Sequence, residues 1–198
     1  MLDSPSNQTD LRSIWVVGSS IVKHAFIHAR RSYDGCNLGL KRHSCRVWWQ
    51  GKSGMTFGEL NPRISYLLQF ENPPDILVIH CGGNSIGQIP LHHLRRQIKE
   101  TILHLEKLLP NTKLIWSQIL PRYNWRYSEN AKAMNFAAAR LNNYAAWLIC
   151  RLGGNYIKYP DLSWDAHGMF NKDGVHLSDL GNDFFLFHLQ AALFDATS

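Results

Sequence analysis

The chain is shaped by one repeated feature, the alternation of short apolar runs with longer segments of helical periodicity. The short runs are rich in β-branched and aromatic residues, which is typical of buried strands. The expected strands are residues 13–17, 45–49, 75–81, 113–119 and 155–158. The expected helices are residues 21–29, 57–70, 91–109, 130–150 and 180–193. Because strands that alternate with helices form parallel sheets covered on both faces, we expect an α/β three-layer sandwich around a five-stranded parallel sheet.

The composition is that of a globular domain. The chain has 198 residues, of which 45% are hydrophobic and 18% charged, so it can bury a core of its own. Residues 1–12 are polar and are interpreted as a tail or linker remnant, which leaves residues 13–198 as the domain. Both ends look trimmed, and our hypothesis is that the domain comes from a longer protein.

Targeting features are absent from the sequence. The chain has no secretory signal and no apolar run long enough to cross a bilayer. Its four cysteines are scattered without a C-x-x-C pair, so neither a zinc site nor a disulfide framework is indicated. We therefore expect a location in the cytoplasm or the nucleus. The sequence does not indicate an oligomeric state.

A net charge of +6 permits contact with nucleic acid. Basic pairs lie at 30–31, 41–42 and 95–96, and residues 122–127 interleave cations with aromatic rings, as single-strand binders do. The same segment is also explained as a solvated loop over a site. One alternative function is therefore a catalytically idle module that binds nucleic acid or another partner.

Chemically useful residues follow the first three expected strands. Ser20 comes after Gly18 and Ser19 at the amino end of a helix, where backbone N–H groups favour an anionic oxygen, although a simple helix cap also explains it. Residues 51–56 form a glycine turn. The third strand ends in two glycines and Asn84, whose side-chain N–H can stabilise an oxyanion or form an Asx turn.

An acid and a base precede the last helix. Asp173 lies three residues before His176, and an aspartate at this distance can orient the imidazole through a hydrogen bond. A second pair, Asp165 and His167, is a competing candidate with shorter spacing. Either pair would lie at the same edge of the sheet as the residues that follow the strands.

The order of these four segments resembles that of the SGNH hydrolases, the GDSL esterase and lipase family, over about residues 13–193. The resemblance implies a flavodoxin-like fold with Ser20 as nucleophile, His176 as base and Asp173 as its acid partner. It also implies an oxyanion hole formed by the N–H groups of Ser20 and Gly54 and by Asn84. No metal or organic cofactor is implied, and the expected activity is hydrolysis of acyl esters, with short acyl groups preferred.

Two positions depart from the family pattern. The family usually has aspartate where this chain has Ser19, and again where it has Ser85, so the local hydrogen bonding is expected to differ. Residues 15–22 and 176–183 further resemble the esterase domain in the first open reading frame of LINE-type retrotransposons.

Other side chains were also considered for chemistry. His24 and His28 have helical spacing and His92 and His93 are adjacent, but we expect surface or core histidines rather than a metal site. The strand-end pair His80 and Cys81 is expected to be packed. The tryptophans at positions 15, 116 and 147 are expected on buried faces.

Overall fold

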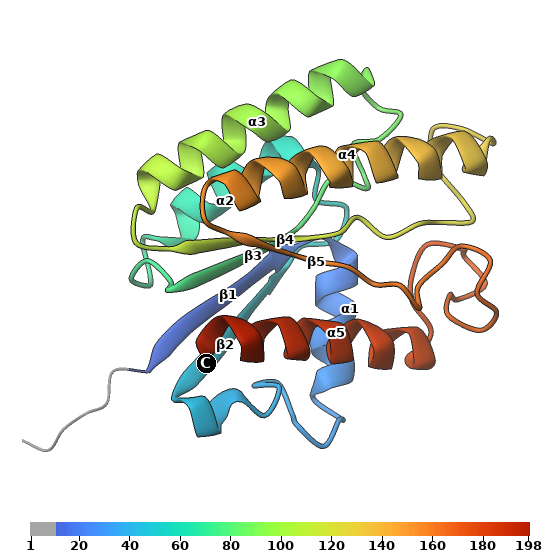
Figure 1. Ribbon diagram of the computed structural model, residues 1–198. Coiled ribbons are helices and arrows are strands. Elements are labelled where there is room, and N and C mark those ends of the chain that lie inside the picture. Colours follow the sequence, from blue (N-terminus) through green and yellow to red (C-terminus); the bar gives the residue numbers. More distant parts are fainter. Residues whose placement is uncertain (1–10) are drawn as a thin grey trace, which may run out of the picture.

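A five-stranded sheet, parallel at every pairing, forms the centre of the molecule in a computed structural model that describes residues 11–198. The strands are β1 (Arg12–Gly18), β2 (Cys45–Gly51), β3 (Ile76–His80), β4 (Lys113–Ser117) and β5 (Asn155–Ile157). Their order is β2-β1-β3-β4-β5 (Figure 1). The winding direction changes at β1, and ligands of such sheets bind beyond the carboxyl ends of the strands at that point.

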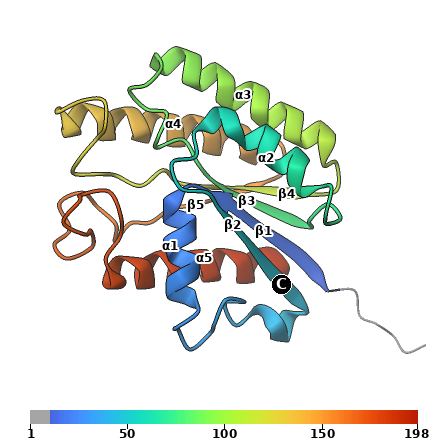
Figure 2. The same cartoon turned by 180° about the vertical axis from the view of Figure 1, so that it is seen from behind.

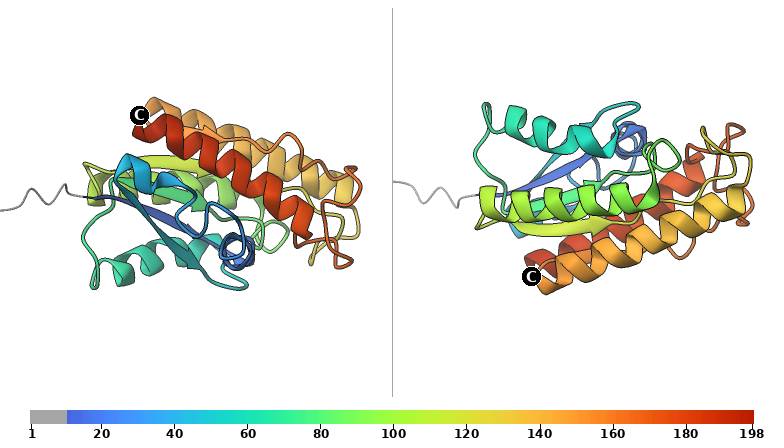
Figure 3. Two further views of the ribbon diagram at one scale, coloured as in Figure 1. Left: turned by 90° about the horizontal axis from the view of Figure 1, so that it is seen from below. Right: turned by 90° about the horizontal axis from the view of Figure 1, so that it is seen from above.

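Helices cover both faces of the sheet, which confirms the predicted three-layer α/β sandwich. They are α1 (Ser20–Ala29), α2 (Leu60–Leu67), α3 (Leu91–Leu108), α4 (Ala131–Arg151) and α5 (Asp179–Thr197), with short 3-10 turns η1 (Leu40–His43) and η2 (Phe57–Glu59). Helices α1 and α5 lie on one face and α2, α3 and α4 on the other (Figures 1 and 2). The views from below and above show each layer in turn (Figure 3).

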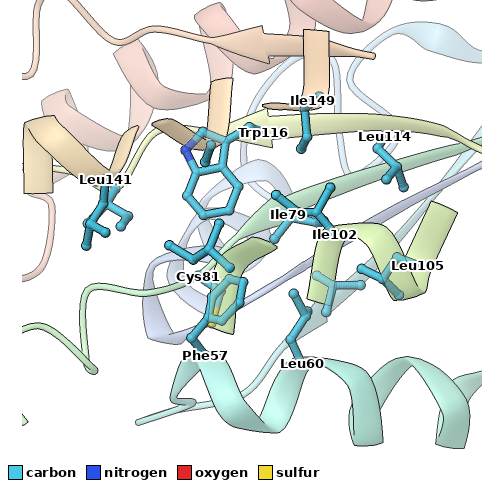
Figure 4. Close-up of a cluster of buried hydrophobic side chains, with 14 of the residues drawn as sticks. Phe57, Leu60, Ile79, Cys81, Ile102, Leu105, Leu114, Trp116, Leu141 and Ile149 are labelled. Atoms are coloured by element: carbon cyan, nitrogen blue, oxygen red, sulfur yellow. The ribbon is translucent and has the colours of Figure 1, made fainter. Parts of the chain in front are cut away.

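Two apolar clusters fill the space between the layers. Successive side chains of a strand point to opposite faces, so Trp15 and Val17 of β1 belong to the cluster beneath α2, α3 and α4. Ile14 and Val16 belong to the cluster beneath α1 and α5. Part of the first cluster surrounds Trp116 of β4, which is fully buried (Figure 4). The site at the strand ends therefore rests on a core that is packed from both sides.

Glycines at the carboxyl ends of β1 and β2 allow unusually close backbone approaches. A Cβ added at Gly18 would lie 2.3 Å from the carbonyl oxygen of His80. One added at Gly51 would lie 2.3 Å from the backbone nitrogen of Lys23. The amino end of α1 is thus held between the loops that follow β2 and β3.

The predicted helix at 57–70 is shorter than expected. The chain first makes η2 and then α2, with Pro62 as the third residue of α2, where its missing N–H costs no helical hydrogen bond. Thr56 and Glu59 form a capping box, in which the carboxylate accepts from the Thr56 N–H at 2.8 Å. Local capping therefore begins the segment as a 3-10 turn.

One predicted core tryptophan lies on the surface. Trp15 and Trp116 are fully buried, but Trp147 is 54% exposed, so the expected buried face is wrong for this residue. Its ring stacks on Tyr144 with centroids 5.9 Å apart, and the Arg151 guanidinium lies 5.2 Å from its centroid. These surface contacts replace core packing on the outer side of α4.

The two ends of the described chain lie together. The Arg12 guanidinium donates to the Thr197 carbonyl at 2.9 Å, which joins the start of β1 to the end of α5. Most of the predicted tail, residues 1–12, falls outside the described residues. Among the described helices, none has the length and apolar character needed to span a membrane.

Candidate active site

Ser20 lies just beyond the carboxyl end of β1, at the switch point of the sheet. It is the first residue of α1, and Ser19 is the N-cap, so Ser20 is not the helix cap that its sequence position also allowed. The Ser19 N–H donates to the His80 carbonyl at 3.3 Å, and the Ser19 side chain makes no capping bond. The N–H of a first helical residue has no acceptor within its own helix and stays available to a ligand.

The structure brings together Ser20, His176 and Asp173, which the sequence placed far apart. Ser20 Oγ lies 2.9 Å from His176 Nε2. The other ring nitrogen, Nδ1, lies 2.6 Å from Asp173 Oδ2. A hydroxyl, an imidazole and a carboxylate in this order can move a proton from the hydroxyl to the ring.

The loop of Asp173 holds its carboxylate in a fixed orientation. Oδ1 accepts from the N–H groups of Val175 and His176, both at 2.9 Å. Burial raises the pKa of Asp173, but the hydrogen bonds from His176 and Val175 outweigh it and lower the pKa to about 2. The carboxylate is therefore ionised at neutral pH and can favour a proton on Nδ1 of the imidazole.

Gly174, between the acid and the base, makes this loop possible. Its φ of +68° lies in the left-handed region. A Cβ there would also lie 2.8 Å from Asn124 Nδ2 and 2.9 Å from Tyr123 Cβ. The Tyr123 N–H donates to the Gly174 carbonyl at 2.8 Å, and Asn124 Nδ2 donates to the Asp173 carbonyl at 2.8 Å. The loop after β4 therefore anchors the loop of the acid and base.

A second imidazole lies against His176. The ring of His24, from α1, has its centroid 4.6 Å from that of His176, with the planes inclined by 33°. Burial and the positive charges of His176 and Lys23 lower the pKa of His24, and Asp173 opposes the shift. His24 thus favours its neutral form beside the proposed base.

The turn after β2 presents Gly54 at the surface, with a φ of +72° and open space around its α-carbon. The next residue, Met55, is fully buried and anchors the turn in the core. Glu59 supports it from the other side, since its carboxylate accepts from Lys52 Nζ at 2.5 Å and from Thr56. These contacts lower the pKa of Glu59 to about 2.

Asn84 follows β3 and joins two loops. Its Nδ2 donates to the Met55 carbonyl at 3.1 Å, beside Gly54. Its Oδ1 accepts from Nη1 and Nη2 of Arg122, each at 3.3 Å. Ser85, at the second departure from the family pattern, accepts from the Phe57 N–H at 2.8 Å and so ties this loop to η2.

The remaining candidates lie apart from Ser20. Asp165 is bonded to Ser163, and both members of the Asp165 and His167 pair are exposed with no hydrogen bond to Ser20. His28 is partly buried, in keeping with the expected surface or core position, and contacts carboxylates: its Nε2 lies 2.6 Å from Asp183, and Asp179 is also near. No cluster of metal-ligating side chains occurs within residues 11–198.

His80 and Cys81 are packed, as expected. His80 Nδ1 lies 2.8 Å from Ser117 Oγ, which in turn lies 2.6 Å from the Tyr159 hydroxyl. Burial, with the nearby charge of Arg122, lowers the pKa of His80 to about 3. Burial raises the pKa of the Cys81 thiol to about 12, so it is no nucleophile at neutral pH.

The sequence does not predict the surroundings of Arg122 and His24. Arg122 belongs to the segment that interleaves cations with aromatic rings, but Arg122 and Trp125 are buried, so the segment is not simply a solvated loop. The only available signal was position, since residues after β4 reach the carboxyl edge of the sheet. The sequence predicts His24 only as a surface or core histidine, and no pattern in it indicates the contact with His176.

Comparisons with known proteins identify the fold. No protein-family model matches the chain, and no curated protein matches it. Several solved structures, however, superpose on it over most of its length. An acetyl xylan esterase superposes with a TM-score of 0.70 at 18% identity, covering 91% of this chain and 98% of that one. A GDSL-like lipase of Bacteroides thetaiotaomicron gives 0.66 at 18%, covering 96% and 90%. The lipase/acylhydrolase of Enterococcus faecalis gives 0.67 at 16%, covering 92% and 95%. The chain thus has the α/β fold of the SGNH hydrolases, the group of GDSL lipases and esterases.

Proposed function

We propose that this chain is a serine esterase that hydrolyses carboxylic acyl esters through an acyl-enzyme. One observation carries the proposal, the pair of contacts from Ser20 Oγ to His176 Nε2 at 2.9 Å and from His176 Nδ1 to Asp173 at 2.6 Å. Solved structures of the same fold include esterases and lipases, which supports the same class of reaction.

In the proposed mechanism Ser20 Oγ attacks the acyl carbonyl while His176 Nε2 accepts its proton. Asp173 holds Nδ1–H and stabilises the imidazolium that forms. The proton passes to the departing alcohol, and a water molecule activated by the same imidazole then releases the acyl group. The carbonyl oxygen becomes an oxyanion, which the N–H groups of Ser20 and Gly54 and the side chain of Asn84 would stabilise.

We further propose a preference for short acyl groups. The hollow lined by Ser19, Gly83 and Val175, which are close in sequence to the proposed site residues, has a volume of only about 10 Å³. Two larger hollows, of about 670 and 680 Å³, flank α4. None of these three hollows is lined by any of the three proposed triad residues, so none of them offers a deep acyl pocket beside the proposed nucleophile, which favours a small acyl group such as acetyl.

The biological setting is proposed from the sequence resemblance. Residues 15–22 and 176–183 support an origin in a retrotransposon-encoded protein that works in the cytoplasm or nucleus. Sequencing the transcript around the coding segment tests this origin, since reverse-transcriptase coding sequence downstream is expected. A transcript that encodes an unrelated enzyme would refute the proposed retrotransposon origin without contradicting the esterase proposal.

The first test is hydrolysis of p-nitrophenyl esters from acetate to octanoate. The wild-type chain is compared with Ser20→Ala and with Ser32→Ala, a matched control beyond the far end of α1 whose hydroxyl bonds to the Ala29 carbonyl. We expect turnover that falls with acyl length, is lost in Ser20→Ala and is unchanged in Ser32→Ala. Equal residual rates in all three folded proteins would refute the esterase proposal.

That negative outcome would favour the alternative of an idle binding module. The basic pairs at 30–31, 41–42 and 95–96 are all exposed and could contact phosphates. Titration of fluorescent single-stranded oligonucleotides at several salt concentrations tests this alternative. Binding through phosphates weakens steeply as salt rises, whereas ester hydrolysis should depend little on salt.

A further inference from the structure

Arg122 is a buried cation at the carboxyl edge of the sheet, directly behind Asn84. Its side chain is 8% exposed, and it forms no ion pair with any carboxylate of residues 11–198. Burial lowers the pKa of Arg122 to about 10, so the guanidinium is still charged at neutral pH. The negative charge of Asp173 opposes this shift, but no carboxylate among the described residues pairs with the guanidinium directly, so its hydrogen bonds must offset much of the cost of burial.

The neighbours of Asn84 leave its amide a single orientation. A guanidinium can only donate, so the amide oxygen must face Arg122. The Met55 carbonyl can only accept, so the amide nitrogen must face Met55. With one N–H used in that bond, the second N–H has no acceptor among the described residues and remains free for a ligand.

Arg122 is itself held from three directions. Asn135 on α4 accepts from the Arg122 N–H and donates to its carbonyl, both at 2.9 Å. The guanidinium lies 5.0 Å from the ring centroid of Trp125. On the other side it packs on the backbone of Gly83, where a Cβ would lie 2.5 Å from Nη2. The guanidinium therefore has little freedom to leave Asn84.

The loop after β4, which carries Arg122, also contacts the loop that carries Asp173 and His176. The residues after Arg122, Tyr123 and Asn124, bond to the backbone of Gly174 and Asp173. A single loop thus links the proposed oxyanion donor to the proposed acid. Its cation lies behind the Asn84 amide, which is the group proposed to face the negative charge of a tetrahedral intermediate.

We propose that Arg122 is a positioning residue, which fixes the amide of Asn84 so that its free N–H faces the oxyanion and polarises that amide with a buried positive charge. This inference rests on the proposed esterase function. Arg122 acts through Asn84 and does not touch the substrate. Its contribution should therefore appear in kcat rather than in KM, because the negative charge on the oxygen develops only in the transition state.

A double-mutant cycle tests this coupling. Arg122→Met keeps much of the apolar packing and removes the guanidinium. We expect it to lower kcat roughly 10- to 100-fold with little change in KM, less than the 10²–10³ for losing a donor outright. In an Asn84→Ala background the same change should cost less than about twofold, since the group it positions is gone. Equal losses in both backgrounds would overturn the inference.

Further variants separate positioning from folding. Gly83→Ala should push the guanidinium aside and reproduce the loss of kcat. Arg122→Lys keeps the positive charge but lacks the two donors of the guanidinium, so its kcat should lie between those of the wild type and Arg122→Met. Arg126→Met removes an exposed arginine of the same loop and should leave kcat unchanged. Thermal unfolding of each variant checks the fold, and wild-type kcat in a folded Gly83→Ala would count against the proposal.

A measurement without substrate separates this inference from the esterase proposal. The side-chain NH₂ signals of Asn84 are assigned in a ¹⁵N correlation spectrum by their loss in Asn84→Asp. We expect Arg122→Met to shift them and to reduce the difference between the two protons, as the amide gains freedom. If they do not change, Arg122 does not orient the amide. If they change but the wild type shows no Ser20-dependent turnover, only the esterase proposal fails.

Discussion

The imidazole of His24 lies against that of His176, with centroids 4.6 Å apart, so the proposed base packs on a second titratable ring. Both rings lie at the carboxyl edge of the sheet, one from α1 and the other from the loop before α5. Because Ser20 also belongs to α1, one helix supplies both the proposed nucleophile and the His24 ring that packs against the proposed base.

His24→Phe should keep this packing without a charge and retain kcat near the wild-type value. His24→Lys places a permanent cation there, beside Lys23 and facing Asp173 and His176. A second positive charge disfavours the imidazolium, so kcat should fall and the acidic limb of kcat/KM should move down by about half to one pH unit. Rate profiles from pH 4 to 9 measure both effects. Identical profiles for the two variants would contradict the electrostatic contact.

Asp173→Asn should abolish the proposed esterase activity while leaving the fold intact. The amide nitrogen would donate to His176 Nδ1, which forces the ring proton onto Nε2, where it can no longer accept from Ser20. A loss of about 10⁴ in kcat is the expected size for such a change of tautomer. Because the pKa of Asp173 is lowered to about 2, the carboxylate form persists through the acid range in which kcat is measured. Activity within tenfold of wild type would argue for another acid.

Asn84→Ala and Asn84→Asp should both lose 10²–10³ in kcat, about the effect of losing one oxyanion donor. Their stabilities should differ, because an aspartate would form an ion pair with Arg122 whereas alanine leaves that buried guanidinium without an acceptor. Chemical denaturation should find Asn84→Asp the more stable of the two. Full activity in either variant would show that Asn84 is not an oxyanion donor.

We expect the free energy of unfolding to fall in mild acid, because His80 is buried in its neutral form. Its pKa is about 3 in the folded chain and near the ordinary 6.5 when unfolded. The neutral ring therefore stabilises the fold fully above pH 6.5, and this contribution is lost as the pH falls towards 3. The free energy of unfolding should decline by up to about 1.4 kcal/mol per pH unit there. His80→Phe should flatten the curve between pH 6.5 and 4.5, above the range in which Asp173 and Glu59 titrate.

Trp116 and Trp147 form a matched pair for testing the core. Trp116 is fully buried and donates from Nε1 to Asn142 at 3.0 Å, so Trp116→Ala should cost about 3–5 kcal/mol. Trp147 is 54% exposed, so Trp147→Ala should cost less than about 1 kcal/mol. Urea denaturation of both variants provides the comparison, and similar costs would contradict the exposed placement of Trp147.

The sheet and its helices could be predicted because their periodicity is local. The runs around Val16 and Val78 are apolar on both faces, which is typical of strands in a parallel sheet covered on both sides, and the helices between them follow from the spacing of their apolar residues. Trp147 could not be placed, since a large ring fits either side of an alanine-rich helix. Arg122 could not be assigned either, because its burial depends on Gly83 and Asn135, which are distant in sequence and meet only in the fold.

The hydrogen bond from Arg12 to the Thr197 carbonyl has a consequence for immobilising or labelling the molecule. It closes the described chain at the amino edge of the sheet, whereas Ser20 lies beyond the opposite edge. A bead, a dye or a fused domain attached at residue 11 or residue 198 would therefore lie at the amino edge of the sheet, away from Ser20. A substrate of the proposed esterase would still reach Ser20 from the opposite edge.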